Sequence, residues 1–222
     1  MSEQQLSERE AHTRMPSWAQ LLEQLPVRQP GLSEREEQTE FPPYGEVEYE
    51  RSVITIPLRL RNQERPVDVM SFDAYMRIIR EPPITSGIGY RQFEFLIDAW
   101  ELTNVYSRGL DANVTITLSK TVQPKSICYA MQQGSDFPAQ IVYNAIYDVY
   151  LDRDPVVQNQ PGVAIAIGVR EIPPRNVTVA FEKPYEGHRF AFSSGMCTGM
   201  RSITVEEFAR GAAEGREYRG EQ

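Results

Sequence analysis

The residues most suggestive of chemistry lie near the C-terminal end of the chain, in the stretch FSSGMCTGM at positions 192–200. Its cysteine, Cys197, lies between Gly195 and Gly199, which is the G-x-nucleophile-x-G spacing of a nucleophile elbow. His188, one of two histidines in the chain, precedes Cys197 by nine residues and is the candidate base. The pair predicts nucleophilic catalysis if a strand ends at the cysteine and a helix begins directly after it.

The flanking sequence favours a structural role for Cys197 instead. The next helix-start pattern is Thr204-x-x-Glu207, which begins too late to direct a helix N-terminus at the sulfur. We therefore interpret the two glycines as turn residues and the thiol as a small, buried apolar group. Catalysis by Cys197 and His188 is the weakest of three functional hypotheses.

Carboxylates and tyrosines offer a second kind of chemistry, acid–base catalysis without a cofactor. Asp98 and Glu101 flank Trp100 at a break in an alternating pattern, where a bulge can re-aim side chains towards a site. A carboxylate that faced inward could move protons. We predict a ligand pocket that includes Trp100, Tyr143 and Tyr147, with Asp98 and Glu101 as candidate acid–base groups. The alternative is that both carboxylates lie on the solvent face of half-buried strands.

Other site chemistries find little support in the sequence. Two histidines and two cysteines, Cys128 and Cys197, supply too few ligands for a multi-histidine centre or a structural zinc site, so we expect no metal and no cofactor. The polar N-terminus, MSEQQLSERE, does not resemble an export signal, and no apolar run approaches the length of a membrane span. We expect a cytoplasmic protein with reduced thiols.

The elements that must position these groups follow from a period of two in the body of the chain, residues 46–213. Apolar residues alternate with polar ones in segments separated by turn residues, which is typical of strands. Nine segments follow this pattern: 52–61, 69–79, 90–102, 113–119, 125–131, 140–152, 162–169, 175–183 and 188–193. We predict an all-β antiparallel sandwich, with a barrel-like form as the alternative, followed by a short helix at about 205–213 and a polar tail at 214–222.

Three details of this pattern carry further expectations. Pro57 cannot donate a backbone hydrogen bond, so it indicates an edge strand or a bulge. The apolar face of 90–102 shifts from Phe93, Phe95 and Ile97 to Trp100, as a bulge would cause. Segment 162–169 is apolar on both faces with small residues on one, which predicts close cover by another layer.

The first 45 residues form a different kind of segment, an acidic arm that we expect to be partly disordered. Residues 1–50 hold eleven glutamates against four arginines, a net charge of −7 out of −8 for the whole chain. Within the arm, residues 17–25 predict a two-turn amphipathic helix that must dock on its own domain or on another chain. Its apolar stripe consists of Trp18, Leu21, Leu22 and Leu25.

These features lead to a functional hypothesis with one main alternative. The absence of basic clusters argues against nucleic-acid binding. We first predict a non-enzymatic binding or assembly module, in which the arm holds a protein partner or a second copy in a homo-oligomer. The alternative is a cofactor-independent isomerase or cyclase, or a ligand carrier, that holds a small molecule inside the β-core.

Overall fold

The computed structural model describes residues 39–60, 63, 65–179, 190–192 and 195–219, with the backbone alone for 176–179 and 215–219. This part of the chain contains twelve strands and one helix. The elements are β1 (Glu46–Leu60), β2 (Asp68–Arg80), β3 (Ile84–Thr85), β4 (Arg91–Leu102), β5 (Val105–Ser107), β6 (Ala112–Leu118), β7 (Ser126–Ala130), β8 (Ala139–Leu151), β9 (Asp154–Val169), β10 (Asn176–Val179), β11 (Phe190–Phe192), β12 (Gly195–Ser202) and α3 (Val205–Arg219).

The prediction of an all-β antiparallel fold is confirmed, and each of the nine predicted segments overlaps a strand. Alternation places the apolar side chains on one face, because successive residues of a strand point to opposite sides. On β1, for example, Ile54, Ile56 and Leu58 are all at most 5% exposed, and on β2 Met70, Phe72 and Ala74 are at most 1% exposed. These faces form one continuous core.

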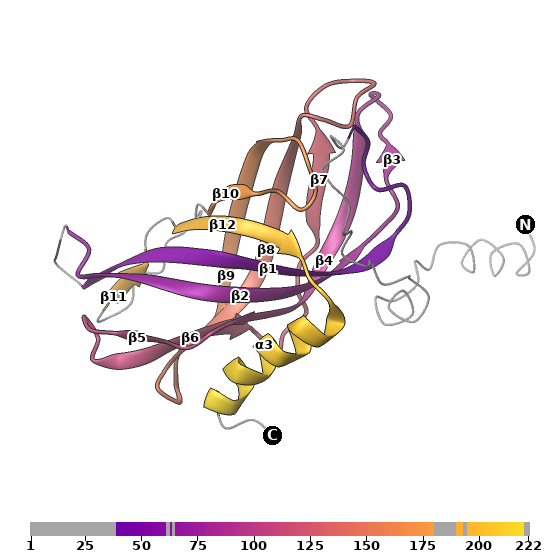
Figure 1. Ribbon diagram of the computed structural model, residues 1–222. Helices are drawn as coiled ribbons and strands as arrows, with labels where there is room; N and C mark the ends of the chain where they lie inside the picture. The colour runs from indigo at the N-terminus through magenta and orange to yellow at the C-terminus, as the bar shows by residue number, and fades with distance from the viewer. Residues whose placement is uncertain (1–38, 61–62, 64, 180–189, 193–194, 220–222) are drawn as a thin grey trace, which may run out of the picture.

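All twelve strands belong to one hydrogen-bonded sheet, with the main order β10-β12-β1-β2-β4-β7-β8-β6-β5. β11 pairs with β1, β3 with β4, and β9 with the free side of β8. The sheet curves around the core so strongly that β10, at one end of this order, comes into contact with β9 (Figure 1). The fold is therefore the barrel-like form of the prediction, in which one sheet encloses its own interior.

A bulge in β4 explains the predicted shift of its apolar face. Ala99 pairs with Arg77 of β2 and Ile97 pairs with the next residue, Ile78, so Asp98 is an extra residue with no partner in the ladder. The extra residue restores the inward direction at Trp100, three positions after Ile97. The predicted bulge is confirmed, and it brings the side chains of Trp100 and Leu102 into the interior.

The interpretation of Gly195 and Gly199 as turn residues is wrong, because both belong to strand β12. This strand pairs with β1 and with β10, so Cys197 has a paired strand on each side. Gly199 has a positive φ of 63° and lies in a bulge, where two residues of β12 oppose Ser52 of β1. Gly195 allows close approach, since a Cβ there would lie 2.7 Å from the backbone oxygen of Thr55.

The environment of Pro57 also differs from the expectation of an edge position. β1 is a central strand with β2 on one side and β12 and β11 on the other. Pairing with β12 ends at Thr55, and pairing with β11 begins at Leu58. Pro57 lies between these two ladders. Neither β12 nor β11 pairs with it, so its lack of an N–H costs no ladder hydrogen bond on this side of β1.

Helix α3 begins as the sequence predicts and continues further. The backbone N–H of Glu207 donates to Thr204 Oγ1 at 3.2 Å, which is the predicted N-terminal cap. The helix reaches Arg219 rather than ending near residue 213, so part of the predicted polar tail is helical. It packs on the outer side of β1, β2 and β4, with the rings of Phe208 and Tyr49 5.1 Å apart (Figure 1). Within the described ranges, no helix combines the length and the apolar character that a bilayer span requires.

Candidate functional site

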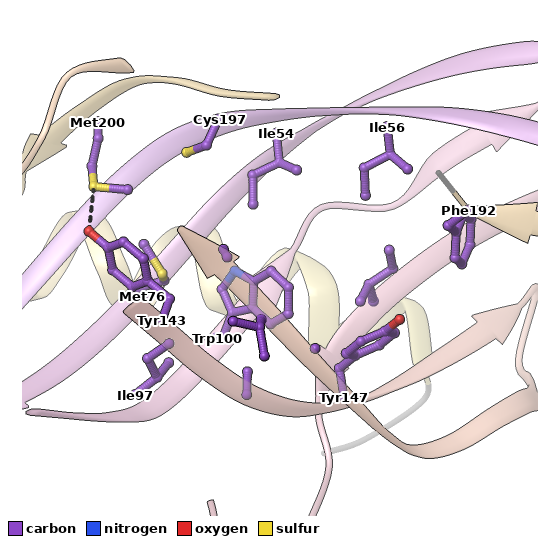
Figure 2. A pocket seen from close by; sticks show the side chains of 15 residues that line it. Ile54, Ile56, Met76, Ile97, Trp100, Tyr143, Tyr147, Phe192, Cys197 and Met200 are labelled. Carbon is purple, nitrogen blue, oxygen red and sulfur yellow. Dashed lines mark hydrogen bonds between the residues drawn. The ribbon is translucent and has the colours of Figure 1, made fainter. Parts of the chain in front are cut away.

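The concave side of the curved sheet holds an apolar cavity of about 70 Å³ that is partly open. A single water needs roughly 10–15 Å³ on the same scale, so the space could hold several waters or a small organic molecule. Figure 2 shows side chains from opposite walls of the sheet pointing towards one another across this space. The lining residues are Ile54, Ile56, Met76, Ile97, Trp100, Ile116, Tyr143, Ala145, Tyr147, Gly162, Val163, Ala164, Phe192, Cys197 and Met200, none of which is charged.

Small residues on β8 and β9 create the space. Ala145 of β8 pairs with Gly162 of β9, and Ala164 pairs with Tyr143, so three inward positions carry at most one carbon beyond the backbone. The expectation that small residues on 162–169 mark close cover by another layer is therefore wrong. On the outer face of the same strand Ile167 is 69% exposed, and no described helix packs there.

Aromatic rings and sulfur atoms form much of the remaining wall. The rings of Trp100 and Tyr147 meet edge to face, with centroids 6.5 Å apart and an interplanar angle of 90°. The hydroxyl of Tyr143 contacts the sulfur of Met200 at 3.9 Å, as the dashed line in Figure 2 shows. The indole N–H of Trp100 is buried without a hydrogen-bond partner. Such a wall offers polarisable contacts and few directed hydrogen bonds.

The predicted pocket residues Trp100, Tyr143 and Tyr147 line this one cavity together. They come from β4 and β8, which are not adjacent along the chain, and both strands alternate as the sequence indicates. The bulge at Asp98 turns Trp100 inward, and positions 143 and 147 share the inward face of β8.

Cys197 is a wall residue of the cavity and is only 3% exposed. Burial is the main reason that its pKa rises to about 11, with a smaller contribution of the same sign from the charge of Glu50. Burial also raises the pKa of the Tyr143 hydroxyl well above its ordinary value. Both groups are therefore protonated at neutral pH. Because Cys197 lies in mid-strand, the strand-to-helix turn of a nucleophile elbow is not formed at this residue.

The two candidate carboxylates do not line the cavity. Asp98 forms an ion pair with Arg77 of β2 and is half-buried. Glu101 lies opposite Tyr75 of β2 and is also half-buried. Each carboxylate directly follows an inward residue, Asp98 after Ile97 and Glu101 after Trp100, so both point away from the cavity.

Sequence reasoning missed a charged group in the interior. Arg80 is 1% exposed and donates to Glu48 at 3.0 Å, to Glu46, and to the backbone oxygens of Pro42 and Tyr44 at 3.1 Å each. Glu48 and Arg80 line a smaller cavity of about 20 Å³, and Tyr143 lines both cavities. The alternating glutamates of EVEYE, residues 46–50, could have indicated a strand with one charged face. They are equally consistent with a continuation of the acidic arm.

Several predicted residues lie outside the described ranges. These are His188, the candidate base, and the stripe residues Trp18, Leu21, Leu22 and Leu25. Among the residues that are described, no three side chains of His, Cys, Asp or Glu gather in a way that could hold a metal ion.

Comparison with known proteins gives a fold likeness. No family model matches the sequence, and no curated protein does. The structure is similar to that of DynF from the dynemicin biosynthesis pathway of Micromonospora chersina, with a TM-score of 0.62. The match covers 88% of this chain and 96% of DynF at 12% sequence identity. At this identity the likeness supports the all-β fold and nothing finer.

Proposed function

We propose that this protein binds a small, uncharged, apolar molecule inside its curved sheet and acts as a carrier rather than as an enzyme. The observation that supports the proposal is the uncharged cavity, whose lining residues come from eight strands and include Trp100, Tyr143, Tyr147 and several aliphatic side chains. Ligand sites are usually concave and mostly apolar, with only a few polar groups. An apolar lining offers water few hydrogen-bond partners, which favours an apolar guest in this space.

The energetics favour a modest affinity for a small guest. Burial of each methylene-sized group contributes about 0.8 kcal/mol, so a seven-carbon molecule gains about 5 to 6 kcal/mol before the cost of association. A net 5.5 kcal/mol would correspond to about 0.1 mM, so after the cost of association we expect dissociation constants of about 0.1 mM or weaker. A charged analogue loses its hydration without finding a counter-charge in this cavity, so it binds far more weakly.

The protonation states support binding over catalysis. The raised pKa values of Cys197 and Tyr143 leave a neutral thiol and a neutral phenol in the wall at pH 7. Neither group is then a nucleophile or a general base. Asp98, the carboxylate predicted for acid–base work, is engaged by Arg77 and lies outside the lining. The likeness to DynF, a protein of the dynemicin biosynthesis pathway, is compatible with a role in handling a small molecule.

The test is a titration with toluene, and with benzoate and benzylamine as charged molecules of similar size. The chain contains only two tryptophans, Trp18 and Trp100, so their two indole N–H signals can be followed by NMR. Toluene should shift the signal of Trp100 in a saturable way, whereas benzoate and benzylamine should not. Equal effects of all three compounds, or no effect of toluene, would refute the proposal.

A matched pair of variants locates the binding site. Ala145→Leu adds three carbons to an inward position of β8, whereas Gln140→Leu introduces the same side chain on the outward face of that strand. We expect Ala145→Leu to weaken toluene binding by a factor of about 10 or more, which corresponds to a loss of about 1.4 kcal/mol or more of binding free energy. The reason is that the added carbons occupy space that toluene would otherwise fill. Gln140→Leu should leave binding unchanged.

A further inference from the structure

A contiguous apolar patch lies on the outer face of the sheet, across three strands. Val142 of β8 pairs with Ile127 of β7 on one side and with Ile165 of β9 on the other. We call Ile127, Val142, Ile146, Ile165 and Ile167 the outer patch. Ile167 is 69% exposed and the other four are half-buried. An apolar patch that spans neighbouring strands on an outer surface usually marks a docking site.

No described helix or strand covers the outer patch. Helix α3 packs on β1, β2 and β4, which form a different part of the curved sheet (Figure 1). The inward side chains of β8 and β9 line the cavity, so the patch is the opposite face of the cavity wall. Whatever docks here would press on the strands that carry Ala145 and Gly162.

We propose that residues 17–25 of the same chain dock on the outer patch. The sequence predicts a two-turn helix there, and such a short helix needs a surface against which to bury its stripe of Trp18, Leu21, Leu22 and Leu25. From Trp18 to Leu25 the stripe extends about 10 Å. The patch extends about 10 Å across three strands and about 13 Å along β8 from Val142 to Ile146, so the two surfaces match in size.

The place where the described chain begins supports docking within one molecule. Phe41 is 1% exposed, and its ring lies 5.2 Å from those of Phe93 and Phe137. Its backbone N–H donates to Asp136 at 2.6 Å. The chain is therefore fixed beside the start of β8, where Val142 lies five residues after Phe137.

The connecting segment is long enough to reach the patch. Residues 26–40 can extend at most about 50 Å. Five residues of strand extend about 17 Å, so the distance from Phe137 to Val142 lies well within this reach. A second copy is not required to supply the helix.

Disulfide cross-linking of the full-length chain tests the proposal. Leu22→Cys with Ile165→Cys places one thiol on the stripe and one at the centre of the patch. The native thiols do not compete, since Cys128 and Cys197 are 0% and 3% exposed. The control pairs Leu22→Cys with Ile84→Cys, because Ile84 is 58% exposed and lies on β3. β3 pairs with Arg91, which contacts Asp136, so this control site is also close to the anchor of Phe41.

We expect the patch pair to cross-link within the monomer roughly ten times faster than the control pair. The same tether gives both pairs a millimolar effective concentration, and only docking holds residue 22 beside residue 165. A cross-linked dimer would mean that another copy supplies the helix, and would overturn the proposal. Equal rates for the two pairs, or no cross-link, would overturn it as well.

Fluorescence provides a second readout that does not depend on cysteines. In a Trp100→Phe background, Trp18 is the single tryptophan. If Trp18 docks on the patch, Ile165→Asp should shift its emission to longer wavelength, whereas Ile84→Asp should not. An unchanged emission in a folded Ile165→Asp variant, judged by circular dichroism, would contradict the proposal.

Discussion

The reactivity of Cys197 distinguishes a wall residue from a nucleophile. We predict that iodoacetamide labels this thiol far more slowly than it labels a small free thiol at pH 7.5. The pKa of Cys197 is about 11. A free cysteine with a pKa near 8.5 is roughly 10% thiolate at pH 7.5, whereas a pKa near 11 leaves roughly 0.03%, a ratio of about 300. Since the thiolate is the reactive species, the rate should fall by at least this factor.

The assay follows labelled peptides by mass spectrometry, so that Cys197 and Cys128 are measured separately without substitution. The rate at Cys197 should increase about tenfold for each pH unit up to pH 10, because the thiolate fraction does. Toluene, if it occupies the cavity, should slow the labelling further, because the thiol lines the same space. Labelling of Cys197 at the rate of a free thiol at pH 7.5 would refute this reasoning and would support Cys197 as a catalytic nucleophile.

Three further predictions concern the sheet that holds the cavity. Arg80→Met should lower the free energy of unfolding by about 3–5 kcal/mol, because buried Glu48 loses its counter-charge. Arg77→Met removes a partly exposed ion pair and should lower it by at most about 1 kcal/mol. Equal losses for the two variants in urea denaturation would contradict this prediction. Gly199→Ala should cost about 1–2 kcal/mol because φ is 63°, and Gly199→Asn should recover part of it, as thermal melting can check. Burial raises the pKa values of Cys197, Cys128 and Tyr143, so each of these groups stabilises the fold below its unfolded pKa and loses that contribution as pH rises above about 9. Cys197 alone accounts for about 3 kcal/mol between pH 9 and pH 11, so urea denaturation should show a loss of at least this size over that range.

The sequence was most informative where one physical rule acted alone. Alternation in β2, β4 and β8 identified the buried faces, and the break before Trp100 identified a bulge. Because both rules are local, the inward positions of Trp100, Tyr143 and Tyr147 could be predicted without knowledge of the strand order.

Prediction failed where the partner strand determines the conformation. Gly195 and Gly199 carry turn-like residue types, yet they form a bulged strand because β1 and β10 pair on both sides. The small residues of β9 predict close packing if a second layer faces them, but in this fold they face a cavity. Arg80 and Glu48 are charged residues, and their burial depends on an ion pair between two strands. Each of these outcomes depends on contacts distant in sequence, which a single sequence does not reveal.

The cavity claim is tested most directly by a crystal structure of the protein with bromobenzene, whose bromine is located by anomalous scattering. The account predicts one strong bromine peak within the curved sheet, in contact with Trp100, Tyr143 and Cys197. A structure in which these side chains pack against one another with no bromine between them would contradict it.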